Sequence, residues 1–141
     1  MSRPLRCQLI PHARSVGAAR VFTSATLEAL GVPPGQVLDC VLVVDELVTN
    51  AVKAEQREAP GLAVAELPPI GLTLETTDKA VLMAVMDASP RDPVRHEAGP
   101  DDENHRGEML VEALCGQEAE VLHFPDGTKE VRASMPLRVA A

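Results

Sequence analysis

A carboxylate and an amide stand four residues apart in a segment of the chain that is otherwise mostly apolar. They are Glu46 and Asn50, and both lie within residues 41–53. Because residues four apart share one face of an α-helix, the two side chains would project side by side. Such a pair suits the binding of a divalent cation through oxygen ligands and the activation of a nucleophile. Asp45 and Thr49 are also four residues apart. The Asp45 carboxylate could be a ligand, or it could form a salt bridge or cap a helix.

Length and composition restrict what kind of protein can carry this pair. The 141 residues suggest a single domain, 1–141, with an aliphatic core, because the chain has no Trp or Tyr. The net charge of -8 argues against direct binding of nucleic acid, which needs clustered Lys and Arg. No apolar run approaches the roughly 20 residues of a membrane span, and no signal peptide is recognisable. The widely spaced Cys7, Cys40 and Cys115 are expected to be reduced, which predicts a cytoplasmic protein without a membrane partner.

The remaining segments show the periodicities of helices and strands in an order typical of an α+β protein. Helical spacing of apolar residues predicts helices over 13–30 and 36–55, and a shorter one between Arg106-Gly107 and Gly116. Short apolar runs predict strands over 5–10, 70–76, 80–86, 118–124 and 130–137, whereas 62–67 fits a strand or a loop. This order favours a two-layer sandwich, in which a mixed, mostly antiparallel sheet is covered on one face by about three helices.

Two further places in this frame carry groups that could complete a site. Asp87 ends the apolar run of a central strand, where a carboxylate can accept a hydrogen bond or simply belong to a turn. Residues 88–106 then form a lid-like loop, and a loop this long is either functional or passive and disordered. Gly107 would open the next helix, so that free backbone N–H groups beside Arg106 could receive phosphate oxygens.

Three motifs in this order resemble the ATP-binding boxes of the gyrase, chaperone and histidine-kinase ATPase superfamily, also called GHKL or Bergerat-fold ATPases. The motifs read DELVTNAV at 45–52, DASP at 87–90 and RGEMLV at 106–111. Within the superfamily they are most similar to the anti-sigma-factor serine/threonine kinases that are abundant in actinobacteria. The resemblance covers the chain from the first helix to the last strand. It implies the Bergerat ATP-binding fold, with ATP and Mg²⁺ as cofactors.

The resemblance also implies a role for each matching residue. Glu46 would be the general base, Asn50 the Mg²⁺ ligand, and Asp87 the acceptor for the adenine amino group. Near the C-terminus the family often shows Gly-Lys-Thr, with the Thr close to the adenine. This chain has Gly127-Thr128-Lys129, so Thr128 takes that role or the role is lost. The expected nucleotide-binding residues are Asn50, Lys53, Asp87, Arg106, Gly107 and Thr128.

Three functions remain open at this point. The first is a regulatory serine/threonine kinase that phosphorylates a small, STAS-like anti-sigma antagonist with Mg-ATP. The resemblance implies a sigma factor as a further partner, and it implies homodimers. The second is a nucleotide-binding module that acts by protein–protein binding without phosphoryl transfer. It is suggested by His105 and Glu108, which depart from the family's pattern around Arg-Gly. The third is a purely structural domain, in which Glu46 and Asn50 form an ordinary polar helix face.

Overall fold

Three helices cover one face of a five-stranded sheet in the computed structural model, which describes residues 3–89 and 103–138. The strand order is β1-β2-β3-β5-β4, and each pairing that the structure describes is antiparallel. The two-layer α+β sandwich is therefore confirmed, with an antiparallel sheet rather than a mixed one. In chain order the elements are β1 (Leu5–Leu9), α1 (Arg14–Ala29), α2 (Pro34–Glu58), a 3₁₀ turn (Val64–Glu66), β2 (Ile70–Thr76), β3 (Ala80–Asp87), α3 (Glu103–Cys115), β4 (Glu120–His123) and β5 (Lys129–Pro136).

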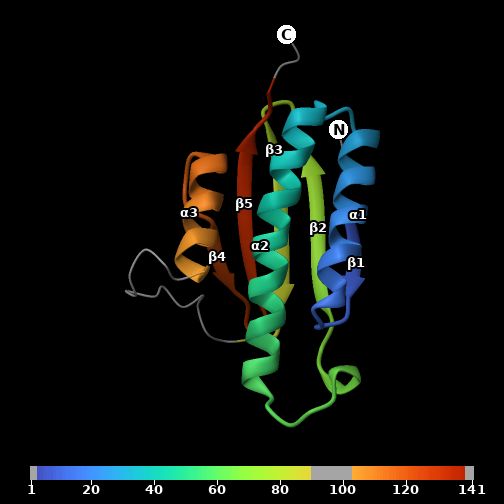
Figure 1. Ribbon diagram of the computed structural model, residues 1–141, viewed down its shortest axis with the longest axis vertical. Helices are drawn as coiled ribbons and strands as arrows, with labels where there is room; N and C mark the ends of the chain where they lie inside the picture. The colour runs from blue at the N-terminus through green and yellow to red at the C-terminus, as the bar shows by residue number, and fades with distance from the viewer. Residues whose placement is uncertain (1–2, 90–102, 139–141) are drawn as a thin grey trace.

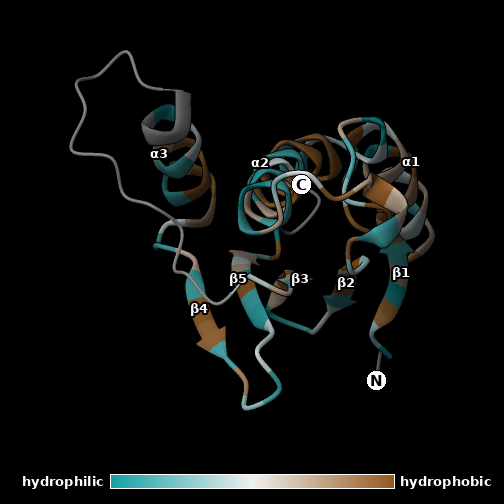
Figure 2. Cartoon of the chain, turned by 90° about the horizontal axis from the view of Figure 1, so that it is seen from below, coloured by the Kyte–Doolittle hydropathy of each residue, from teal (hydrophilic) through white to brown (hydrophobic). Residues whose placement is uncertain are grey.

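The helices lie side by side in one layer and the strands in the other (Figures 1 and 2). Helix α1 packs against β1 and β2, α2 against β3, and α3 against β5. Helix α2 is therefore the central one, with a neighbouring helix on each side. Any polar side chain that leaves α2 sideways must point into the gap toward α1 or toward α3.

A glycine and a proline define where helix α2 begins. Gly31, after α1, has a φ of +82°, a left-handed conformation that glycine adopts without strain. Pro34 is the first residue of α2, a position where its missing N–H costs nothing. The helix runs for 25 residues, a few more at each end than the predicted 36–55. Its inner face is apolar, and each fully buried Val or Leu there contributes roughly 1.5–3 kcal/mol through the area removed from water.

The sheet buries one face against the helices. The burial of β2 alternates strictly over its first five residues, as expected for a strand with one covered face. Residues 62–67 form no strand; the 3₁₀ turn Val64–Glu66 stands there, so the loop interpretation is the right one. Pro68 and Pro69 follow, and neither can donate a backbone hydrogen bond to a sheet.

The C-terminal end of β5 is anchored to the beginning of α2. The side chain of Gln36 is buried; its Nε2 donates to the carbonyl of Pro136 at 2.8 Å, and its Oε1 accepts from the N–H of Arg138 at 2.8 Å. Arg138 also forms an ion pair with Asp39 at 2.7 Å. These contacts join the beginning of α2 to the end of β5.

Two sequence-based expectations on the cysteines and on membranes can be compared with this fold. Cys40 and Cys115 are buried, Cys7 is half-buried, and all three are free. Burial raises the pKa of the Cys40 thiol to about 12, so it stays protonated at neutral pH. Within residues 3–89 and 103–138, no helix has the length and apolar character needed to cross a bilayer.

Candidate functional site

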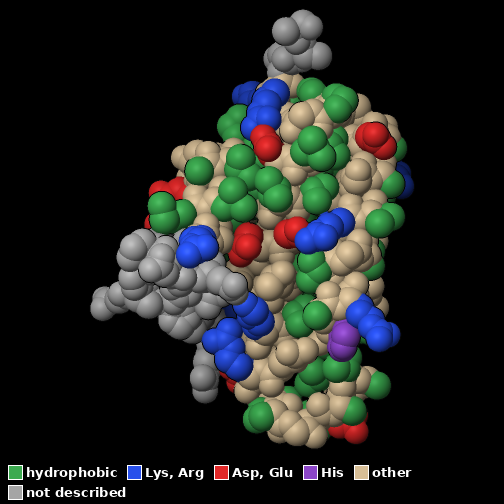
Figure 3. Space-filling view, viewed as in Figure 1, with side chains coloured by type: hydrophobic (Ala, Val, Ile, Leu, Met, Phe, Trp, Pro, Cys, Tyr) green, Lys and Arg blue, Asp and Glu red, His purple; other side chains and the backbone are tan. Residues whose placement is uncertain are grey.

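A pocket of about 250 Å³ opens between α2 and α3. Five of the seven residues that line it belong to the predicted site, and they come from both helices. Charged side chains of both signs gather around the middle of the helical face in which the pocket lies (Figure 3). The lining residues are Glu46, Thr49, Asn50, Lys53, Arg106, Gly107 and Leu110.

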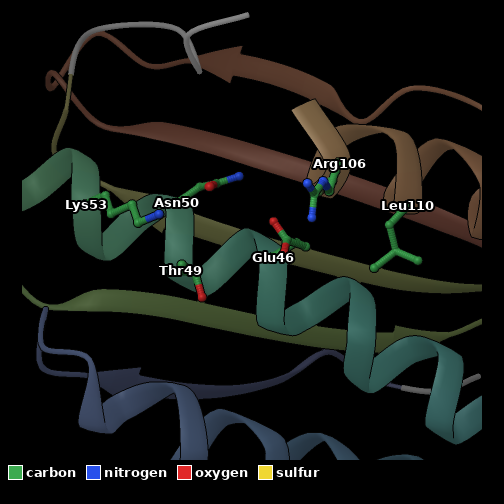
Figure 4. A pocket seen from close by; sticks show the side chains of 7 residues that line it. Glu46, Thr49, Asn50, Lys53, Arg106 and Leu110 are labelled. Carbon is green, nitrogen blue, oxygen red and sulfur yellow. The ribbon is translucent and has the colours of Figure 1, made fainter. Parts of the chain in front are cut away.

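Helical spacing explains why the α2 residues meet at this pocket. Glu46, Asn50 and Lys53 follow one another at intervals of four and three residues, and therefore share one face. The neighbouring Leu47 and Val48 are buried in the core, which orients the polar face toward α3. Figure 4 shows the Glu46 carboxylate and the Arg106 guanidinium pointing toward one another across the gap. The predicted grouping of carboxylate, amide and cations is thus present in the fold.

Gly107 lets α3 pass close to the carboxylate of Glu46. A Cβ atom at position 107 would overlap the Glu46 Oε2 atom, so any side chain larger than hydrogen would displace that carboxylate. Gly107 does not open the helix, as the sequence suggested; it is the fifth residue of α3, which begins at Glu103. Its N–H is therefore committed to the helix ladder and is not a free phosphate donor. The glycine matters at this position because it has no side chain.

The donor set of the pocket fits Mg²⁺ held together with phosphates. No three His, Cys, Asp or Glu side chains in the described ranges 3–89 and 103–138 could hold a metal ion as a group. Mg²⁺ usually takes one or two protein oxygens and completes its shell with phosphate oxygens and water. The amide oxygen of Asn50, one turn from Glu46, can supply such an oxygen without adding negative charge. Lys53 and Arg106, which line the same pocket, can neutralise phosphate.

Asp45 belongs to a different contact. Its Oδ1 and Oδ2 atoms accept hydrogen bonds from Nε of Arg20 at 2.7 and 2.9 Å. Arg20 lies on α1, so Asp45 joins α2 to the helix on the side opposite the pocket. Of the two roles that the sequence left open for Asp45, the salt bridge is the one that the structure has.

Asp87 is buried at the end of β3 and is not among the residues that line the pocket. It faces Lys129 in the register of β3 and β5, and the Lys129 Nζ lies 3.6 Å from the Asp87 Oδ2. The other oxygen, Oδ1, accepts the backbone N–H of Ser89 at 2.8 Å. Burial raises the pKa of the Asp87 carboxyl, while Ser89 and Lys129 pull it back down. Its predicted role in adenine recognition stays a prediction.

The end of β3 is also held by the last turns of α2. Glu55 is buried and accepts the N–H of Ala88 at 2.6 Å. The hydroxyl of Ser89 donates to Glu58 at 3.4 Å. Burial is also the main reason why the pKa of the Glu55 carboxyl is raised. Glu55 was not predicted from the sequence, because an amphipathic helix pattern does not indicate that a charged residue will be buried.

Thr128 is placed in the turn between β4 and β5. Its hydroxyl donates to the Oδ1 of Asp126 at 2.6 Å, and its N–H donates to the same atom at 3.0 Å. It is not one of the residues that line the pocket, and its predicted role near the adenine stays a prediction. The residue opposite Asp87 is Lys129, which sequence reasoning also missed. The signal was available, since Lys129 stands second after Gly127, where the family pattern has Thr.

The lid-like loop predicted at about 88–106 can be described only at its ends. Residues 90–102 lie outside the described part of the chain, while Glu103 to Arg106 are helical and belong to α3. The helix therefore starts earlier than predicted. The side chain of His105 also lies outside the described residues. Glu108 is half-buried on α3 and is not one of the lining residues.

Comparisons with known proteins agree with this fold. The sequence model of the histidine kinase-like ATPase domain matches residues 11–133. The RsbU and RsbW domains of Rv1364c from Mycobacterium tuberculosis match with a TM-score of 0.69 and 21% identity, over 99% of this chain and 34% of that chain. This chain thus spans about a third of that protein's length. The SiaB–SiaC complex from Pseudomonas aeruginosa matches with a TM-score of 0.68 and 12% identity, over 93% of this chain and 88% of that chain. No curated protein matches.

Proposed function

The chain belongs to the family of histidine kinase-like ATPase domains, and from this premise we propose that it is a regulatory protein kinase using Mg-ATP. The pocket between α2 and α3 is the proposed nucleotide site. The observation that carries the proposal is the meeting of Glu46, Asn50 and Arg106, from two helices, around one cavity. An ordinary solvated helix face would not need a glycine without a side chain packed against its carboxylate.

Four of the lining residues have tasks in this proposal. Lys53 and Arg106 neutralise and position the triphosphate, because charge-assisted hydrogen bonds to phosphate are strong and directional. Asn50 offers its amide oxygen to Mg²⁺, which when bound neutralises charge on the phosphates. Glu46 accepts the proton of the attacking hydroxyl. The hydroxyl oxygen bonds to the γ-phosphorus as the bond from that phosphorus to the β,γ-bridging oxygen breaks, and ADP leaves.

The proposed acceptor is a serine or threonine of a small, STAS-like antagonist of an anti-sigma system. Two considerations support it: the family resemblance of the three motifs, and the folds of the RsbU–RsbW domains and of the SiaB–SiaC complex. Binding of a sigma factor and formation of a homodimer, both in the cytoplasm, complete the proposal. They follow from the family resemblance alone.

Separate measurements of binding and transfer test this function. Calorimetry with Mg-ATP should show binding, and Arg106→Ala should weaken it by about 10- to 100-fold, since a hydrogen bond to a charged group is worth about 1.5–3 kcal/mol. Arg20→Ala is the matched control, because Arg20 pairs with Asp45 away from the pocket. No binding at millimolar Mg-ATP would refute the proposal.

Transfer is then followed with γ-labelled ATP and a STAS-like antagonist protein from the same genome. Glu46→Gln should lower the rate by about 100- to 10,000-fold while Mg-ATP still binds, as expected for loss of a general base. A second candidate function is a nucleotide-binding module without transfer. His105 and Glu108, which flank Arg106-Gly107 and depart from the family's pattern there, favour it. Binding without transfer, unchanged by Glu46→Gln, would select the module.

A further inference from the structure

Two leucines on the outer side of α2 are exposed to solvent. Leu38 is 68% exposed and Leu42 is 44% exposed, whereas Val43 and Val44 on the inner side of the helix are fully buried. The two leucines are four residues apart, so they lie one above the other on the same helix face. Figure 3 shows hydrophobic side chains gathered over the upper half of α2, above the charged side chains at the middle of the helical face. Leu38 and Leu42 are called the aliphatic patch below.

The aliphatic patch is continuous with the proposed site. Glu46 follows Leu42 by four residues, so the patch and the proposed base form one row along α2. At a rise of about 1.5 Å per residue, Leu42 and Leu38 lie about 6 and 12 Å from Glu46 along the helix axis. Figure 4 shows Leu110, which lines the pocket from α3, on the side of Glu46 that faces the beginning of α2. Exposed apolar surface that adjoins a reactive group is typical of a binding surface.

Two ion pairs on the same stretch of α2 expose their cations more than their anions. Arg20 pairs with Asp45, and their side chains are 57% and 18% exposed. Arg138 pairs with Asp39, and their side chains are 47% and 27% exposed. Asp39 stands next to the aliphatic patch at one end and Asp45 at the other. The two guanidinium groups therefore favour acidic side chains at the rim of whatever covers the patch.

The small size of the aliphatic patch indicates which kind of partner covers it. A stable interface between two proteins buries about 800 Å² on each of them, and two half-exposed leucines supply only a small part of this area. The patch is therefore too small to hold a second copy of the chain permanently. It suits a protein that binds briefly and leaves, as the acceptor of a phosphoryl group must do after each transfer.

We propose that the aliphatic patch of Leu38 and Leu42 is the docking surface for the protein that accepts the phosphoryl group. The matching segment of the acceptor carries an aliphatic side chain about 6–12 Å from its serine or threonine hydroxyl, with acidic side chains around it. Docking in this way places the hydroxyl beside Glu46. This inference rests on the proposed kinase function, and it adds where the acceptor binds and by what chemistry it is recognised.

Replacing both leucines by glutamine tests the inference. The double variant Leu38→Gln with Leu42→Gln should fold, because both side chains are exposed and glutamine is a good helix former. With γ-labelled ATP and the STAS-like antagonist, its KM for the antagonist should rise about 10- to 30-fold, as expected when two half-exposed leucines are no longer covered. The kcat at saturating antagonist and the Kd for Mg-ATP should stay within about twofold of the wild-type values.

Leu62→Gln is the matched control. Leu62 is also an exposed leucine, but it lies beyond the end of α2, so its replacement should leave the KM for the antagonist unchanged. An unchanged KM in the double variant would overturn the inference. A lower kcat with an unchanged KM would also overturn it, because the leucines would then act on Glu46 and not on the acceptor. Sedimentation velocity gives a third check, since loss of a wild-type dimer in the double variant would show that a second copy covers the patch.

Calorimetry separates failure of the inference from failure of the proposed function. The antagonist is titrated into the full chain loaded with Mg²⁺ and a non-hydrolysable ATP analogue, and the double variant should bind it about 10- to 30-fold more weakly. Equal binding by the wild type and the double variant would overturn the docking surface and leave the kinase function standing. A wild-type chain that neither binds nor phosphorylates the antagonist would overturn both. Binding to the wild type should also weaken as salt is added, and an affinity independent of salt would exclude the acidic rim.

Discussion

Replacing Gly107 by Ala should separate the stability of α3 from the placement of the proposed base. In a helix interior, Ala is about 0.8–1.0 kcal/mol more favourable than Gly. At position 107, however, the new methyl group would overlap the carboxylate of Glu46. That carboxylate is the end of a flexible side chain, so it can move aside at about 0.5–1.5 kcal/mol of rotamer strain. The two contributions nearly cancel, and stability should change little.

The cancellation can be demonstrated with a double-mutant cycle. In a Glu46→Ala background the three atoms nearest to the new methyl group are gone, so Gly107→Ala should then stabilise the protein by about 1 kcal/mol. The coupling between the two positions should be about 0.5–1.5 kcal/mol, measurable by urea unfolding. Gly17→Ala is the control, because a Cβ atom at this position in α1 meets nothing within 4 Å and should stabilise in either background.

The functional effect of Gly107→Ala should be large although its effect on stability is small. A displacement of a catalytic group by about 1 Å can lower a rate by about 100-fold. Phosphoryl transfer should therefore fall by about that factor, while Gly17→Ala transfers at the wild-type rate. Equal stabilisation by Gly107→Ala in both backgrounds would refute the close approach of Gly107 and Glu46. Undiminished transfer would show that this approach does not position the base.

Two further predictions concern buried polar groups. Among the described residues, the buried hydroxyl of Thr23 on α1 lacks a hydrogen-bond partner, so Thr23→Val should raise the unfolding free energy by about 1 kcal/mol in urea titrations. A loss of stability would reveal a hidden partner. Burial raises the pKa of Glu55, so the folded chain binds more protons than the unfolded one, and stability falls as pH rises through the raised pKa. Glu55→Gln keeps an acceptor for Ala88; its Tm should exceed that of the wild type at neutral pH and converge with it below the ordinary pKa of 4.5. Parallel pH profiles for the two proteins would contradict this.

Much of the fold follows from local patterns. The helix over 36–55 and the strands over 70–76 and 80–86 were recognisable because apolar periodicity reports which face of an element is buried. The exact start of α3 was not recognisable, because residues 88–106 carry no such periodicity. The helix begins at Glu103, which places Gly107 inside it and changes the physical reason for that glycine.

The candidate site likewise combines features that the sequence predicts with features that only the fold determines. The sequence by itself determined that Glu46 and Asn50 share a helix face, because residues four apart are neighbours in any α-helix. Only the tertiary structure decided what they face. The packing of α3 brought Arg106 and Gly107 against that face, and the register between β3 and β5 placed Lys129 against Asp87. Helix packing and strand pairing join residues far apart in the chain, and no local spacing encodes which of them will meet.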